Sequence, residues 1–166
     1  MDEKLKKGLS SLTYGLYVVT VDDGETKCAM VASWVSQVSY NPPRIMVGIK
    51  KVRFIHNILM ELSEVSKKDG DVHFGLMVVQ KGRETDLKRI KAGDQKSLFS
   101  GDNVIAGRSG APLFNDYLCA FELKLVETLD AGDHTLFIGE VEDVVITGDG
   151  PPSSTLDYKK VYIGDI

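Results

Sequence analysis

The sequence predicts a mainly β protein whose antiparallel strands form a closed or nearly closed barrel. About seven segments are rich in β-branched and aromatic residues, and turn residues separate them. Two or three short helical segments occur at irregular positions. Because strands and helices do not alternate regularly, a doubly wound parallel sheet is disfavoured. The length of 166 residues suits a single domain spanning 1–166.

The first third of the chain predicts one helix and three extended segments. Leucines at helical spacing favour a short amphipathic helix over the first dozen residues. A strand at 15–21 ends in the hairpin turn Asp22-Asp23-Gly24. Residues 27–39 are predicted as further extended chain, which Asn41-Pro42-Pro43 interrupts because proline cannot donate to a β-ladder. The apolar segment 44–49 predicts a buried strand.

The middle of the chain combines helices, one strand and a long loop. Apolar residues between 54 and 62 form one stripe of a helix, and alternating apolar residues at 72–78 predict a strand. Residues 85–92 predict a short helix. The glycine-containing segment 101–112 predicts a loop.

The last part of the chain predicts two long strands joined by a turn. Apolar residues alternate over 117–125, and 135–147 follow after the turn 129–134. Residues 148–154 predict a loop, and 158–163 predict a final strand.

Composition and charge exclude several classes of protein. Twenty basic and 24 acidic residues give a formal charge of −4, which argues against a nucleic-acid or anionic-membrane partner. The two cysteines and three histidines are scattered, so no metal site is expected. The N-terminal segment lacks the apolar core of a signal peptide, and no apolar run is long enough to span a membrane. These observations predict a soluble protein of the reducing cytoplasm.

Common catalytic motifs are missing from the chain. It contains no GxGxxG after a strand, no GxxxxGK[ST] and no GxSxG. If the protein is an enzyme, a cofactor therefore supplies its difficult chemistry.

Three segments have features that fit a cofactor. The strand around Ser33, Ser36 and Ser39 can offer backbone groups and hydroxyls to the edge of a flat heteroaromatic ring, although the pattern alone also fits an ordinary half-buried strand. The segment 47–53 places three cations at the start of a helix, where anions such as phosphate bind, although a solvated turn has the same pattern. His134 stands at the start of a strand, where it can bind a ring edge or carry a proton, or simply form part of the turn.

Five motifs together resemble one known family. They are Tyr14-Gly-Leu-Tyr-Val-Val-Thr20, Val31-Ala-Ser-Trp-Val-Ser-Gln-Val-Ser39, Pro42-Pro43, Gly110-Ala-Pro112 and Gly132-Asp-His-Thr-Leu-Phe-Ile-Gly-Glu-Val141. In this order they resemble the flavin reductase-like family of FMN-binding split β-barrels, nearest its ferric reductase and flavoredoxin branch. The resemblance covers about residues 10 to 147. It departs from the family at Ile55, where a threonine is common.

The resemblance implies a homodimer with FMN bound near the subunit interface. It implies flavin-ring contacts from one strand, namely Val31, Ala32, Ser33, Trp34, Val35 and Gln37. It implies phosphate contacts from the next strand end and helix start, namely Gly48, Ile49, Lys50, Lys51, Arg53 and Phe54. It also places His134 beside the flavin or the nicotinamide, as the catalytic candidate.

The resemblance implies an FMN-dependent oxidoreductase with NAD(P)H as electron donor. The acceptor would be free flavin, a ferric chelate or a redox protein. Two alternatives remain open: a flavoredoxin-like electron carrier that binds FMN without reacting with a nicotinamide, and a split barrel that serves as a structural or ligand-binding module without flavin.

Overall fold

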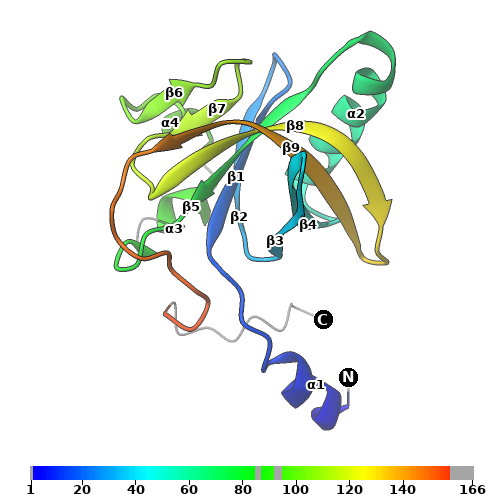
Figure 1. Ribbon diagram of the computed structural model, residues 1–166, viewed down its shortest axis with the longest axis vertical. Coiled ribbons are helices and arrows are strands. Elements are labelled where there is room, and N and C mark those ends of the chain that lie inside the picture. Colours follow the sequence, from blue (N-terminus) through cyan, green and yellow to red (C-terminus); the bar gives the residue numbers. More distant parts are fainter. Residues whose placement is uncertain (1, 85–86, 92–94, 158–166) are drawn as a thin grey trace.

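One strongly curved antiparallel sheet forms the body of the protein (Figure 1). The computed structural model describes residues 2–84, 87–91 and 95–157. Within this part of the chain, seven strands pair in the order β2-β1-β5-β8-β9-β4-β3, and every pair is antiparallel. These strands are β1 (Tyr17–Asp22), β2 (Lys27–Ala32), β3 (Val35–Tyr40), β4 (Pro43–Lys50), β5 (His73–Val78), β8 (Cys119–Asp130) and β9 (His134–Ile146). The mainly β antiparallel class is confirmed.

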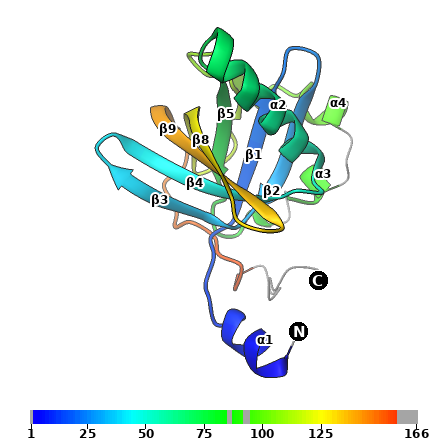
Figure 2. The same ribbon diagram turned by 90° about the vertical axis from the view of Figure 1, so that its right-hand side faces the viewer.

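Helices and a small hairpin surround this sheet. They are α1 (Glu3–Leu9), α2 (Phe54–Asp69), α3 (Leu87–Lys91), α4 (Gln95–Leu98), and the paired strands β6 (Val104–Ala106) and β7 (Pro112–Phe114). The predicted N-terminal helix is confirmed, but none of its residues is buried, and Figure 2 shows it standing apart from the sheet.

Side chains that alternate across the strands divide the interior into two apolar clusters. On one side of the sheet, α2 packs its apolar stripe against the strands, and the largest members of this cluster are Phe74, Phe137, Ile49, Ile55, Leu59, Leu76 and Leu123. On the other side, α3, α4 and the β6–β7 hairpin cover a second cluster, which includes Val18, Met77, Ala120, Leu87, Leu98, Leu113 and Phe114. Each cluster forms because a strand presents successive side chains to opposite faces.

A close approach explains how the β6–β7 hairpin reaches the sheet. The hydroxyl of Thr20 donates to the carbonyl of Pro112. Gly75 lies at the same point, and a Cβ there would be 2.8 Å from Leu113 Cδ2 and 2.9 Å from the Pro112 carbonyl oxygen. The missing side chain therefore lets the hairpin backbone pack directly on the sheet.

The structure corrects several boundaries. Residues 27–39 form two strands, because the chain turns at Ser33 and Trp34, where the Val35 amide donates to the Ser33 carbonyl. Residues 101–112 contain β6 and the start of β7, whose three-residue length leaves no periodic pattern to detect. Helix α4 is missing from the prediction, and β8 continues to Asp130, so the turn is shorter than expected. The predicted strand at 158–163 lies outside the described residues.

No helix in the described residues is long and apolar enough to cross a membrane.

Candidate functional site

Trp34 and His134 form the centre of the candidate site. Their ring centroids are 4.2 Å apart with 32° between the planes, and the Tyr14 and Trp34 ring centroids are 6.3 Å apart. Trp34 lies at the turn between β2 and β3, whereas His134 is the first residue of β9. The two are 100 positions apart in the sequence and meet only because β4 pairs with β9.

Gly48 makes room for the indole. Its amide donates to the Trp34 carbonyl at 2.8 Å, and a Cβ at Gly48 would stand 3.3 Å from Trp34 Cβ. In the β4–β9 register, Gly48 faces Leu136 and Lys50 faces His134. The predicted ring-binding strand, phosphate-binding segment and histidine therefore meet in one place.

Asp133 holds the imidazole of His134. The Asp133 Oδ1 atom lies 2.7 Å from His134 Nδ1. This hydrogen bond is the main cause that lowers the pKa of Asp133; desolvation opposes it, and the charges of His134 and Lys50 lower the pKa further. Because a carboxylate can only accept, Nδ1 carries the hydrogen and Nε2 is the nitrogen left for another partner. The His134 side chain is 16% exposed.

The indole N–H of Trp34 lacks an acceptor. Trp34 Nε1 is buried and has no hydrogen-bond partner among the described residues. An indole nitrogen can only donate, and a buried donor without a partner is costly. The site therefore suits a ligand that brings an acceptor atom, and the carbonyl oxygens and ring nitrogens of a flavin are such acceptors.

The start of α2 has the features of an anion site. Arg53 occupies the N-cap position in extended conformation, no side chain caps the helix, and its first turn contains no acidic residue. Val52 and Phe54 beside it are 81% and 61% exposed. Uncapped N–H groups at a helix N-terminus, flanked by cations, favour a bound anion.

The three cations of this segment are not equivalent. Lys51 Nζ lies 2.8 Å from Asp130 Oδ2, and this hydrogen bond, together with one from the Gly132 amide, lowers the pKa of Asp130. Lys51 is therefore tied to the β8–β9 turn. Lys50 lies close enough to Asp133 for its charge to lower the pKa of that carboxyl group.

The other predicted residues differ in how they can take part. Ala32, Ser33 and Ile49 are buried. Ala32 and Ile49 belong to the core, so only their backbones are available to a ligand. Val31 is half-buried against the second cluster. Val35 and Gln37 pair with the core-facing residues Val47 and Ile45, which turns them away from the Trp34–His134 face.

Sequence reasoning missed Tyr14, Asp133 and Asp130 as parts of this site. Asp133 directly precedes the candidate histidine, so its adjacency was an available signal. Tyr14 and Asp130 reach the site only through the fold.

Known proteins resemble this chain in sequence and in fold. It is 32% identical over 153 residues to the ferric-chelate reductase (NAD(P)H) of Archaeoglobus fulgidus, covering 89% of this chain and 84% of the relative. It is also 32% identical over 164 residues to the high molecular weight rubredoxin of Moorella thermoacetica, covering 95% of this chain and 67% of the relative. A diflavin flavoprotein of Synechocystis is 31% identical over 146 residues, or 85% of this chain, but the chain spans only 24% of its length.

A solved structure confirms the fold. BorF, the flavin reductase component of a bacterial two-component tryptophan halogenase, superposes with a TM-score of 0.72 at 28% identity, covering 87% of this chain and 88% of BorF. The model of the flavin reductase like domain matches residues 9–163. From this match over most of its length, the chain belongs to the flavin reductase-like family.

Proposed function

We propose that this protein binds FMN on the face formed by Trp34 and His134 and passes electrons from NAD(P)H to an acceptor. One observation carries the proposal. The buried, unpartnered indole nitrogen of Trp34 lies beside His134, close to a helix start that has the features of an anion site. A flavin mononucleotide combines an acceptor-rich ring with a phosphate, which matches both features.

Each residue has a distinct role in this proposal. Trp34 donates its N–H to the flavin ring, and the backbone from Val31 to Gln37 lines the ring. The first-turn amides of α2, with Lys50 and Arg53, hold the phosphate, while Lys51 fixes the adjoining turn through Asp130. A charge-assisted hydrogen bond to phosphate contributes about 1.5–3 kcal/mol, so two such contacts are enough to favour FMN over riboflavin.

The bound flavin would supply hydride and single-electron transfer, which no side chain in this chain can supply. The protein positions the reactants and controls charge. Asp133 fixes the His134 tautomer so that Nε2 faces away from Asp133 and can bind or donate a proton at the ring edge. Trp34 packs on the imidazole and shields it from water.

The relatives support this proposal. The Archaeoglobus fulgidus relative is a ferric-chelate reductase (NAD(P)H), which favours NAD(P)H as the donor and a ferric chelate as an acceptor here. BorF is the flavin reductase component of a two-component system, which favours free flavin as another acceptor.

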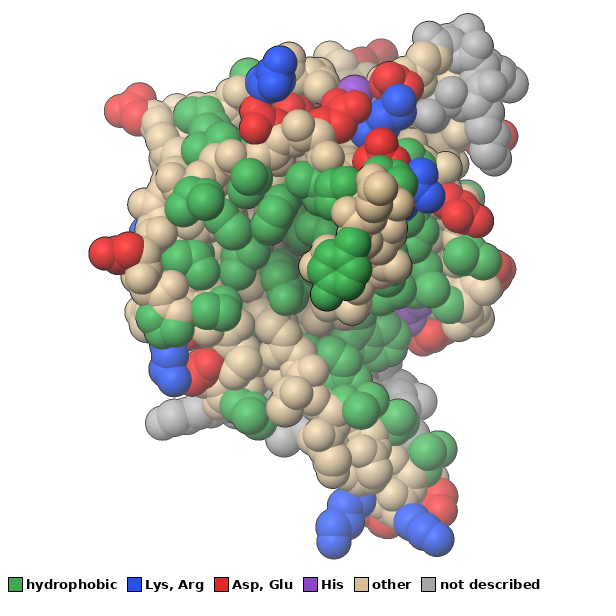
Figure 3. All heavy atoms as spheres, in the orientation of Figure 1, with side chains coloured by type: hydrophobic (Ala, Val, Ile, Leu, Met, Phe, Trp, Pro, Cys, Tyr) green, Lys and Arg blue, Asp and Glu red, His purple; other side chains and the backbone are tan. Residues whose placement is uncertain are grey.

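We further propose that the protein is a homodimer. Apolar side chains gather on one face of the molecule (Figure 3). Val144 and Ile146 on β9 are 41% and 75% exposed, and in register beside them lie the half-buried Phe121 and Cys119. A second copy would cover this apolar surface. Sedimentation velocity at micromolar concentration with FMN bound should give a dimer, and a monomer would reject this part of the proposal.

The experiment for the main proposal uses the chain's single tryptophan. Because Trp34 lies in the site, FMN should quench most of the tryptophan fluorescence on binding, and riboflavin should bind more weakly. The holo-protein is then mixed anaerobically with NADH and, separately, NADPH, and flavin absorbance is followed. Bleaching by either nicotinamide supports a reductase. Tight FMN binding without bleaching indicates an electron carrier, and no flavin binding rejects both.

A further inference from the structure

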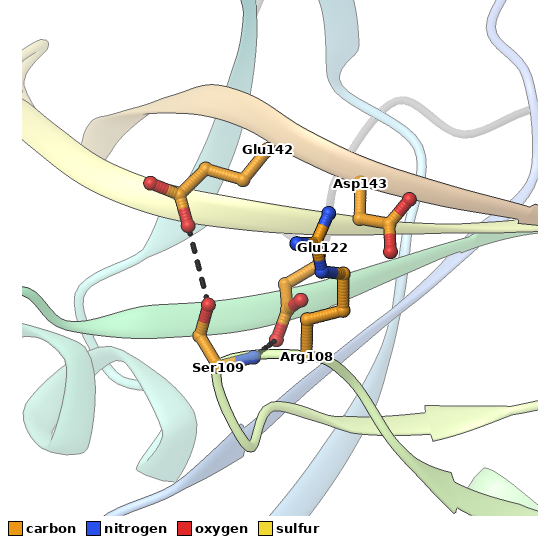
Figure 4. A pocket seen from close by; sticks show the side chains of 5 residues that line it. All are labelled: Arg108, Ser109, Glu122, Glu142 and Asp143. Carbon is orange, nitrogen blue, oxygen red and sulfur yellow. Dashed lines mark hydrogen bonds between the residues drawn. The ribbon is translucent and has the colours of Figure 1, made fainter.

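A cavity lies away from the Trp34–His134 face. It has a volume of about 410 Å³ and is lined by Arg108, Ser109, Glu122, Glu142 and Asp143 (Figure 4). The first two residues come from the loop between β6 and β7, and the three carboxylates come from β8 and β9. Asp143 stands nine residues farther along β9 than His134, so this cavity is separate from the proposed flavin site.

An irregularity in the sheet creates the acidic wall. Glu122 pairs with Asp143, but the next residue, Leu123, pairs with Val141, so Glu142 is an extra residue on β9. Such a β-bulge bends the strand and redirects its side chains. Figure 4 shows the side chain of Arg108 between Glu142 and Asp143, in front of Glu122.

Glu122 is the most deeply buried member of the cavity. Its side chain is fully buried, and its Oε1 accepts hydrogen bonds from the amides of Ser109 at 3.0 Å and Ala111 at 3.2 Å. Its Oε2 is also buried but has no partner among the described residues. Leaving a buried carboxylate oxygen without a hydrogen-bond donor is costly, so a ligand in the cavity that donates to Glu122 Oε2 would be stabilised.

The neighbouring carboxylates are held in place by the protein. Glu142 Oε2 receives His73 Nε2 at 2.7 Å and the Ser109 hydroxyl at 3.2 Å, while Asp143 Oδ1 accepts from the Val144 amide at 2.8 Å. Each of these two side chains retains a second oxygen. The cavity therefore presents three carboxylates against the single guanidinium of Arg108.

Charge and spacing together define the ligand. Three carboxylates favour a cation over an anion. Yet no group of three or more His, Cys, Asp and Glu residues in the described chain is arranged to hold a metal ion. We therefore expect a larger cation, whose hydrogen-bond donors are far enough apart to reach separate carboxylates. The volume is within the range of small-molecule sites. We propose that this cavity binds a small organic cation with several N–H donors, such as a guanidinium joined to a primary amine, and that Glu122 Oε2 accepts from it.

The proposal predicts opposite effects on binding for the two acidic residues and for Arg108. Removing an acceptor by Glu122→Gln or Asp143→Asn should weaken binding, by about tenfold to a hundredfold for Glu122. Removing the like charge by Arg108→Ala should strengthen binding of a cation, whereas it would weaken binding of an anion. Glu127→Gln, at an exposed carboxylate of the same strand β8, should change nothing and serves as the matched control.

The test is isothermal titration calorimetry with agmatine, which carries both donor groups, on the full chain. Saturable binding that weakens in Glu122→Gln and Asp143→Asn, strengthens in Arg108→Ala and is unchanged in Glu127→Gln supports the proposal. Absence of saturable binding, wild-type affinity in both acidic variants, or weaker binding in Arg108→Ala overturns it. Binding of calcium or magnesium ions in place of agmatine also overturns it. If Glu122→Gln does not fold, the binding of agmatine to Asp143→Asn and Arg108→Ala tests the proposal.

Discussion

The indole of Trp34 packs on the imidazole of His134, which Asp133 holds by a hydrogen bond to Nδ1. The Trp34–His134 ring centroids are 4.2 Å apart, and Asp133 Oδ1 is 2.7 Å from His134 Nδ1. The ring is thus fixed by packing against the tilted indole and by one hydrogen bond. Its remaining nitrogen is Nε2, so the orientation of the candidate catalytic group depends on an exposed neighbour.

Replacing Asp133 should allow the His134 imidazole to adopt either tautomer. In Asp133→Asn the amide can either donate or accept, so Nδ1 is no longer required to carry the hydrogen. We expect the rate of flavin reduction by NAD(P)H to fall while FMN affinity changes little, since Asp133 does not belong to the phosphate site. ¹⁵N NMR of the imidazole would show a mixture of tautomers. Unchanged tautomer and rate in Asp133→Asn would contradict the proposed role.

The cations at the start of α2 should differ in their effect on FMN. Lys51 is engaged by Asp130, so Lys51→Ala should alter FMN affinity little. Lys50→Ala and Arg53→Ala should each weaken FMN by roughly tenfold to a hundredfold, the effect of losing one charge-assisted contact. Fluorescence titration with FMN measures this, and riboflavin is the control because it lacks the phosphate. If all three variants bind FMN like the wild type, the phosphate lies elsewhere.

The contact between Gly75 and the β6–β7 hairpin should be sensitive to one added methyl group. In Gly75→Ala the new Cβ would be 2.9 Å from the Pro112 carbonyl oxygen, which is backbone and cannot easily move. Overpacking of this kind costs about 1–3 kcal/mol. Thermal unfolding should show a lower Tm. Gly8→Ala is the control, because nothing lies within 4 Å of its Cβ position, and an equal Tm change in both variants would refute the explanation.

Asp157 should make stability depend on pH in acid. Hydrogen bonds from Lys81 and from the hydroxyl and amide of Ser154 lower the pKa of Asp157 from 3.8 to about 2. Because the folded-state pKa is the lower one, the stabilisation is complete above pH 3.8 and is lost as the pH falls through about 2. Urea unfolding of wild type and Asp157→Asn from pH 7 to pH 2 measures this. A stability difference that stays constant over this range would be inconsistent with the lowered pKa.

Much of the fold follows from local patterns in the sequence. The hairpin between β1 and β2 was predictable because Asp22-Asp23-Gly24 interrupts two β-rich segments, and Gly24 has a φ of +91° that favours glycine. Helix α2 was predictable from its apolar stripe, and β8 and β9 from their alternation. These signals are local and depend only on which face of an element is buried.

Tertiary structure decided what local patterns do not encode. Strands β6 and β7 are three residues long and are held by packing on Thr20 and Gly75, which lie far away in the sequence. The candidate site likewise depends on contacts between residues that are far apart in the sequence. The sequence indicated His134, Trp34 and the cations at 50–53, but the β4–β9 register brought them together and tied Lys51 to Asp130. The β3–β4 register turned Gln37 away from this face, because strand pairing, and not the residue type, fixes which side chains share a face. The fold also buries the Trp34 indole nitrogen without a partner among the described residues.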